Sequence, residues 1–149
     1  MSSDPLRAVA DELEIRNLIA RLAHSADDTD DLVGDYVSLF TEDAIWEGAS
    51  VGHRQGHAVL LAGAQERRES GGTGPGSCTR HVINTCVIEV DGDEASGRSI
   101  FHFYTGTDGA PVLAIIGVYH DRFRRTAEGW RLAHRVIHRA NDPDTNTPE

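Results

Sequence analysis

The 149-residue chain carries 14 Lys plus Arg against 24 Asp plus Glu, a formal net charge of −10 at pH 7, and its length and 39% apolar content suit one folded domain. The negative balance argues against a nucleic-acid partner and against docking on an anionic membrane, because both need a basic surface. No apolar run approaches the roughly 20 residues of a membrane span and no secretory signal is visible, so we expect a cytoplasmic protein.

Three helical segments are predicted in the first half of the chain. Asp4 and Pro5 supply helix-start chemistry for the first one. The apolar positions of this helix form one stripe, which consists of Ile15, Leu18, Ile19, Leu22 and Ala26. The acidic run 27–31 ends it and can cap a second helix, whose predicted buried face is Val33, Tyr36, Val37 and Phe40. A short strand at 44–46 and a turn-rich piece at 52–56 then precede a third helix at 57–69.

Four long strands are predicted in the second half. They span Cys78–Val90, Glu94–Thr107, Pro111–Arg125 and Gly129–Ala140. The links between them are short, and two contain Asp-Gly, the strongest local signal for a hairpin. The second half is therefore predicted to be an antiparallel meander, which the helices cover on one face. Such a layout defines an α+β domain over residues 1–140, followed by a disordered polar tail at 141–149.

Alternation along the strands sorts their side chains into two faces, odd-numbered and even-numbered. The strand 111–125 is apolar on both faces, since Leu113 and Ile115 are odd whereas Ile116 and Val118 are even. Both faces should therefore be covered. The helices can cover only one of them, so we expect a homo-oligomer, a homodimer or homotrimer, to stack on the outer face of the sheet.

Several kinds of chemistry find no motif in this chain. His134 and His138 have i, i+4 spacing on a strand, which separates them more than the helical spacing of zinc motifs does. Cys78 and Cys86 lie in no activating context, and the glycine-rich loop 70–77 lacks the Lys-Ser/Thr of a phosphate loop. We therefore expect no metal and no organic cofactor, and a structural role for the two thiols.

An acid–base pair remains as a candidate. Asp27 lies where the apolar stripe of the first helix ends, and His81 opens the first long strand. A carboxylate and an imidazole from separate elements can meet over a sheet cavity, where the carboxylate orients the ring and stabilises the imidazolium. From spacing alone, the default interpretation is that Asp27 is an ordinary helix-end residue and His81 an ordinary strand histidine.

The order of motifs resembles the SnoaL-like branch of the nuclear transport factor 2-like superfamily over residues 13–139. The resemblance consists of the Ala23-to-Asp27 step, Phe40–Ala44 ("lFtpDa") followed by Trp46, Gly52–Gly56, Arg80–Asn84 ("H-x-x-N"), Gly117–Asp121 and Gly129–Arg131. It implies a cone-shaped domain in which three N-terminal helices close a curved, antiparallel-rich sheet around a pocket.

The resemblance also implies site residues. The chain resembles scytalone dehydratase, lindane dehydrochlorinase and the steroid isomerase-like members of this superfamily. Scytalone dehydratase and lindane dehydrochlorinase use an Asp–His dyad at positions that match Asp27 and His81. It further implies a mostly apolar pocket. The implied pocket residues are Trp46, Phe101, Phe103, Tyr119 and Arg135, and those on the long strands are all odd. The even-numbered histidines 102, 120, 134 and 138 then lie on the outer face.

The implied function is a cofactor-independent lyase or isomerase of the dehydratase type, acting on a small hydrophobic molecule. His81 removes a proton, Asp27 polarises the imidazole of His81, and Arg135 or Tyr119 stabilises the developing negative charge. The alternative is a non-catalytic ligand-binding or assembly domain of the same fold, including a role like that of a dioxygenase β subunit.

The sequence departs from the family pattern at two points. An extra tyrosine of other members is replaced by Leu22 and His24, the latter expected to be exposed, and Asp28 competes with Asp27 for the inward position.

Overall fold

A computed structural model describes residues 4–140, and the predicted tail at 141–149 lies outside the described residues. The first helix, α1 (Pro5–Asp28), starts as predicted, with the Asp4 carboxylate accepting a hydrogen bond from the Leu6 backbone N–H at 3.0 Å. Within residues 4–140, no helix is both long enough and apolar enough to cross a membrane.

The second helical segment is shorter and wound differently from the prediction. It consists of one π turn, η1 (Leu32–Tyr36), and one 3-10 turn, η2 (Val37–Leu39). Because this winding does not keep a 3.6-residue period, the predicted buried face is partly wrong. Tyr36, Val37 and Phe40 are buried as predicted, but Val33 is 60% exposed, and Phe40 belongs to the first strand rather than to the helix.

The strands form one six-stranded sheet in the order β2-β1-β6-β5-β4-β3. Their bounds are β1 (Phe40–Gly48), β2 (Gly52–Gln55), β3 (Thr79–Asp91), β4 (Glu94–Thr105), β5 (Val112–Thr126) and β6 (Gly129–Arg139). The meander β3–β6 is antiparallel, as predicted. β1 is longer than predicted, runs parallel to β6 and pairs with β2, which replaces the predicted turn-rich piece.

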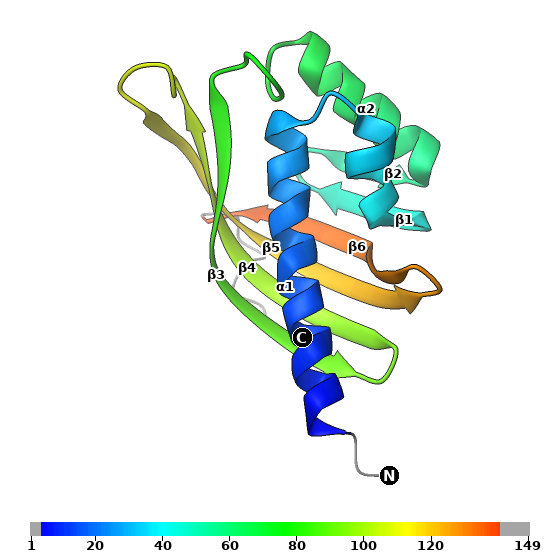
Figure 1. The fold of residues 1–149 in the computed structure, drawn as a ribbon. Coiled ribbons are helices and arrows are strands. Elements are labelled where there is room, and N and C mark those ends of the chain that lie inside the picture. Colours follow the sequence, from blue (N-terminus) through cyan, green and yellow to red (C-terminus); the bar gives the residue numbers. More distant parts are fainter. Residues whose placement is uncertain (1–3, 141–149) are drawn as a thin grey trace.

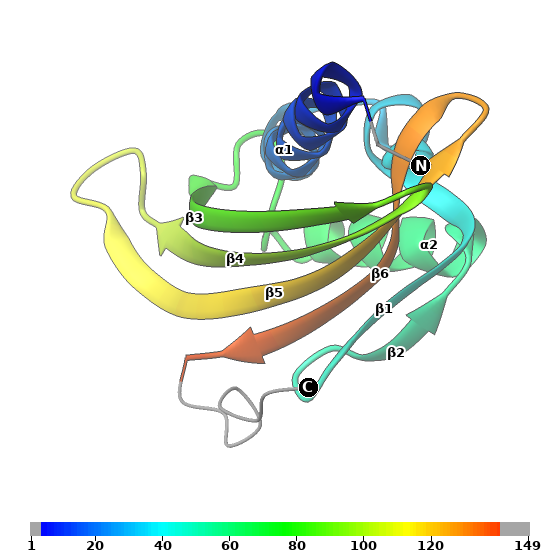
Figure 2. The ribbon, with the colours of Figure 1, turned by 90° about the horizontal axis from the view of Figure 1, so that it is seen from below.

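Both α-helices lie on the same side of the curved sheet (Figures 1 and 2). α1 crosses β3 and β6, whereas α2 (His57–Glu69) packs against β1 and β2. The core fills the space between these layers, and α1 contributes Ile15, Leu18, Ile19 and Leu22 to it. The fold is thus the predicted α+β arrangement, with three helical segments on one face of the sheet.

An ionic clamp fixes the N-terminal half of α1 to the sheet. Asp11 is 6% exposed, and its carboxylate accepts hydrogen bonds from Arg125 Nη1 and Nη2 at 2.8 and 2.7 Å and from Trp130 Nε1 at 3.0 Å. These hydrogen bonds, chiefly those from Arg125, hold the pKa of Asp11 below its usual value. The clamp sets the position of the whole helix, including its far end.

Two bulges decide which side chains face the helices. The pairing of β3 with β4 shifts between Ile83 and Cys86, so His81 and Ile83 face inward before the shift, while Cys86, Ile88 and Val90 pack against the core after it. β6 shifts similarly, so that Trp130 and Leu132 share the inward face with Arg135. The odd-number rule therefore holds around the predicted pocket and fails beyond each bulge.

Candidate active site

Asp27 and His81 meet at the end of α1. The Asp27 Oδ1 atom lies 2.8 Å from His81 Nδ1, and its Oδ2 accepts the His81 backbone N–H at 2.8 Å. Asp27 is 3% exposed, while the His81 side chain keeps 19% of its surface. Because an ionised carboxylate only accepts hydrogen bonds, His81 Nδ1 must be the donor. The neutral ring then has an unprotonated Nε2, the atom that can act as a base.

The neighbouring carboxylate points the other way. Asp28 is 54% exposed at its side chain, and both of its oxygens lie 2.8 Å from Arg80 Nη1. The hydrogen bond with Asp28 raises the pKa of Arg80. Asp27 is therefore the inward residue, which resolves the choice between the two. His24 is exposed at 80% of its side chain, as expected, and lies 3.8 Å from Asp28.

A cavity of about 30 Å³ lies against the dyad. α1 lines it with apolar side chains, β3 contributes Ile83 and His81, and the other elements contribute the remaining polar groups, which form its polar wall. The lining residues are Ile19, Leu22, Ala23, Ala26, Tyr36, Trp46, Arg67, His81, Ile83, Tyr119 and Arg135. A cavity of this volume has room for about one or two water molecules but not for a ring-sized molecule, which needs some 300 Å³ or more. A larger ligand therefore requires this wall to open.

Three of the five predicted pocket residues line this cavity, namely Trp46, Tyr119 and Arg135. The other two lie behind it and support its wall. The Phe103 ring packs on His81 with centroids 4.7 Å apart, and the Phe101 ring stacks on Tyr119 at 4.2 Å. Their contribution is to fix the two polar rings rather than to line the cavity.

A buried ion pair holds the polar wall in place. Arg135 donates from Nε and Nη2 to the two oxygens of Asp121, each at 2.8 Å, and the two side chains are 6% and 0% exposed. The guanidinium carbon lies 3.8 Å from the centre of the Tyr119 ring. Burial raises the pKa of Tyr119, so its hydroxyl stays protonated and can donate a hydrogen bond at neutral pH.

Sequence reasoning missed Tyr36 and Arg67 as cavity residues. Tyr36 has apolar neighbours at helical spacing, which predicted a core position, and it does pack edge-on against Phe40 at 5.3 Å. Arg67 lies in the last turn of α2, where a basic residue is ordinarily solvated. Its guanidinium instead lies 4.8 Å from the centre of the Trp46 ring. No local sequence signal distinguishes such an arginine from its neighbours.

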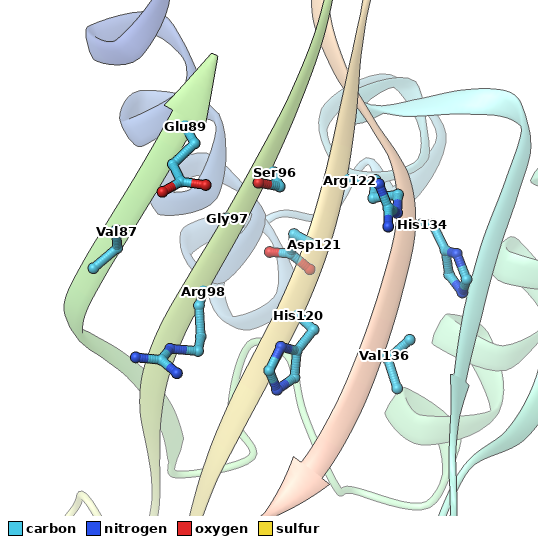
Figure 3. A pocket seen from close by; sticks show the side chains of 10 residues that line it. All are labelled: Val87, Glu89, Ser96, Gly97, Arg98, His120, Asp121, Arg122, His134 and Val136. Carbon is cyan, nitrogen blue, oxygen red and sulfur yellow. The ribbon is translucent and has the colours of Figure 1, made fainter. Parts of the chain in front are cut away.

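Neither cysteine lines this cavity, and the outer histidines lie on the other face of the sheet. Cys86 is partly buried and packs against the core, and burial raises the pKa of its thiol, which argues against an activated nucleophile. The outer face of the sheet contains a separate hollow of about 400 Å³ (Figure 3). It exposes Arg98, His120 and His134, and these even-numbered residues lie on the face opposite the dyad, as predicted.

Comparisons with known proteins agree with this architecture. Residues 7–136 match the model of the SnoaL-like domain family, while no curated protein matches the chain. A nuclear transport factor 2-like protein with a cystatin-like fold from Novosphingobium aromaticivorans is 25% identical, with a TM-score of 0.77 over 93% of this chain and 88% of the other. A protein of unknown function from Nostoc punctiforme is 25% identical, with a TM-score of 0.77 over 97% of both chains.

The structure of LinA is also similar, with a TM-score of 0.72 and 18% identity over 90% of this chain and 88% of the other. At that identity the likeness concerns the fold alone. The predicted family resemblance and the predicted fold class are both confirmed by these matches.

Proposed function

The chain belongs to the SnoaL-like domain family, and on that premise we propose that it is a cofactor-independent lyase or isomerase of the dehydratase type. Its substrate is a small, largely hydrophobic molecule. The observation that carries the proposal is the 2.8 Å contact between Asp27 Oδ1 and His81 Nδ1 beside a small cavity. A carboxylate in this position orients the imidazole and stabilises its protonated form, which is what a general base needs.

The reaction begins when His81 Nε2 removes a proton from a substrate carbon next to an electron-withdrawing group. The negative charge that develops faces the polar wall, where the buried side chains of Tyr119 and Arg135 supply donors. One such donor typically accounts for a factor of roughly 10²–10³ in rate. Loss of a leaving group completes an elimination, whereas return of the proton to another carbon completes an isomerisation.

Proton abstraction can be measured before the natural substrate is known. Small cyclic ketones and β-hydroxy ketones are incubated with the protein in D₂O, and deuterium incorporation is followed by mass spectrometry. We expect Asp27→Asn and His81→Gln each to lower the exchange rate by a factor of about 10²–10⁴, the usual contribution of a positioned general base.

Two control variants match these substitutions closely. Asp28→Asn changes the adjacent carboxylate, which pairs with Arg80 on the surface, and His102→Gln changes an outward-facing histidine on the neighbouring strand. Both should retain the exchange rate. If Asp27→Asn and His81→Gln remain folded and exchange as fast as these controls, the dyad is not the base.

The alternative, a non-catalytic ligand-binding or assembly domain, predicts that the Asp27 and His81 side chains do not converge. The convergence of both carboxylate oxygens on one histidine supports the enzyme instead. A dyad that leaves deuterium exchange unchanged while the cavity still binds a small ketone would favour the alternative.

We also propose that the outer face of the sheet mediates self-association into a homodimer or homotrimer. Register places Val82, Ile100 and Ile116 on this face, and they are 38%, 38% and 42% exposed. The hairpin between β4 and β5 extends beyond the sheet (Figure 1) and exposes 60% of Val112. Analytical ultracentrifugation should show an oligomer that Ile100→Glu with Ile116→Glu dissociates, and a monomeric parent protein would refute this.

A further inference from the structure

Most polar groups that line the dyad cavity can donate hydrogen bonds. They are Tyr36, Trp46, Arg67, His81, Tyr119 and Arg135, and the lining includes no Asp, Glu, Asn or Gln. Guanidinium and indole groups donate hydrogen bonds and accept none, a tyrosine hydroxyl can donate as well as accept, and only His81 Nε2 is an acceptor without a proton to donate. A cavity built in this way selects a ligand that is rich in acceptors. An anionic ligand suits it best, because the wall also carries positive charge.

The two arginines of this wall differ in their partners. Arg135 is neutralised by Asp121, whereas among residues 4–140 Arg67 forms no ion pair with a carboxylate. Arg67 lies over the Trp46 ring, with its guanidinium carbon 4.8 Å from the ring centre. It therefore holds a positive charge beside the cavity that the protein itself leaves uncompensated.

Trp46 adds a second unmatched donor at the same place. Its indole N–H is buried and has no hydrogen-bond partner in the described part of the chain. Leaving such a group unpaired is unfavourable, since it lost water on burial and gained nothing in return. A ligand oxygen beside Arg67 can satisfy both the N–H and the guanidinium.

We propose that the substrate carries a carboxylate, bound by Arg67 together with the Trp46 indole N–H. This rests on the proposed function and narrows its substrate class to small, otherwise apolar acids. The carboxylate serves as an anchor, and planar guanidinium groups hold carboxylates through paired hydrogen bonds. The anchor orients the remaining part of the substrate, so that its acidic C–H faces His81 Nε2 and its electron-withdrawing group faces Tyr119.

Binding measurements test this without knowledge of the reaction. Acetate, crotonate and benzoate are each compared with the corresponding amide by ligand-observed NMR and isothermal titration calorimetry. The full-length protein should bind at least one carboxylate, and bind it at least tenfold more tightly than the amide of the same shape. Arg67→Met should abolish this preference, and Trp46→Phe, which keeps the ring and removes the N–H, should weaken carboxylate binding several-fold.

Arg98→Met is the matched control, because Arg98 lies in the outer hollow on the opposite face of the sheet. This variant should retain the preference. The proposal is overturned if no carboxylate binds, if amides bind equally well, if the preference survives Arg67→Met, or if Arg98→Met removes it. Deuterium exchange tests the dyad separately. If the parent protein shows no preference for carboxylates but its exchange still depends on Asp27 and His81, only the carboxylate anchor is refuted. If the preference is present but exchange does not depend on the dyad, only the proposed base is refuted.

Discussion

Replacing Asp121 with Asn tests how strongly the buried ion pair stabilises the fold. The Asp121 side chain is fully buried and meets Arg135 through two hydrogen bonds of 2.8 Å. Burial by itself lowers the pKa of Arg135, but the charge and hydrogen bonds of Asp121 more than offset this and raise it. A guanidinium is effectively always protonated in proteins, so in the variant the Arg135 charge stays inside the protein beside a neutral partner.

Two estimates of the loss agree. Unit charges about 4 Å apart attract by roughly 4 kcal/mol at an effective dielectric constant near 20. Breaking a buried pair by removing one partner typically costs about 3–5 kcal/mol. Asn retains the shape and can accept one hydrogen bond, so we expect the free energy of unfolding to fall by about 3 kcal/mol. For a chain of this size that corresponds to a decrease in Tm of roughly 6–12 °C.

Urea denaturation followed by circular dichroism measures this loss, and a double variant gives its control. Asp121→Leu combined with Arg135→Met removes both charges, and hydrophobic replacement of a whole buried pair is often neutral or stabilising. The double variant should therefore be more stable than Asp121→Asn. A loss below about 1 kcal/mol for Asp121→Asn, or a double variant as unstable as the sum of its two single variants, would refute this reasoning.

Three further predictions concern stability. Gly117→Ala places a Cβ 2.4 Å from the Phe101 ring, so the free energy of unfolding should fall by about 1–3 kcal/mol in urea titrations, and an unchanged midpoint would contradict this. Because the pKa of Asp11 is lowered, its ionised form stabilises the protein above pH 3.8, its ordinary pKa, and this stabilisation is lost as the pH falls further. Asp11→Asn should therefore flatten the acid branch of a plot of unfolding free energy against pH. Equal slopes for the variant and the parent protein would refute the assignment. Asp4→Ala should cost about 1 kcal/mol by removing the cap of α1, and Asp4→Ser should restore most of it.

Local signals predicted α2 and the four long strands well. α2 begins and ends at the predicted residues, and each long strand lies within two residues of its predicted bounds, because hairpin links and alternation are properties of short segments. β1 and β2 were underestimated for the opposite reason. β1 is completed by parallel pairing with β6, some 90 positions later, and β2 has the sequence Gly-His-Arg-Gln, which shows no apolar alternation.

The candidate site likewise contains residues that the sequence predicted and residues that it did not. Asp27 and His81 were found through the order of family motifs, and the structure brings them together. Arg67 was not found, because its place beside Trp46 depends on how α2 packs on β1 rather than on any spacing along the chain. Alternation also assigns the residues of β3 after Ile83 to the wrong face of the sheet, because the bulge between Ile83 and Cys86 cannot be seen in the amino-acid pattern.

One helix connects the two ends of this molecule. Asp11 is clamped to the sheet, and Asp27 lies 16 residues further along α1, a distance of about 24 Å in an unbroken helix. α1 thus acts as a rigid rod, and a small tilt about the clamp becomes a sideways displacement of the carboxylate at its tip. Substitutions around Asp11 can therefore lower the rate of proton transfer at His81 by displacing Asp27, even in variants whose cavity residues are all unchanged.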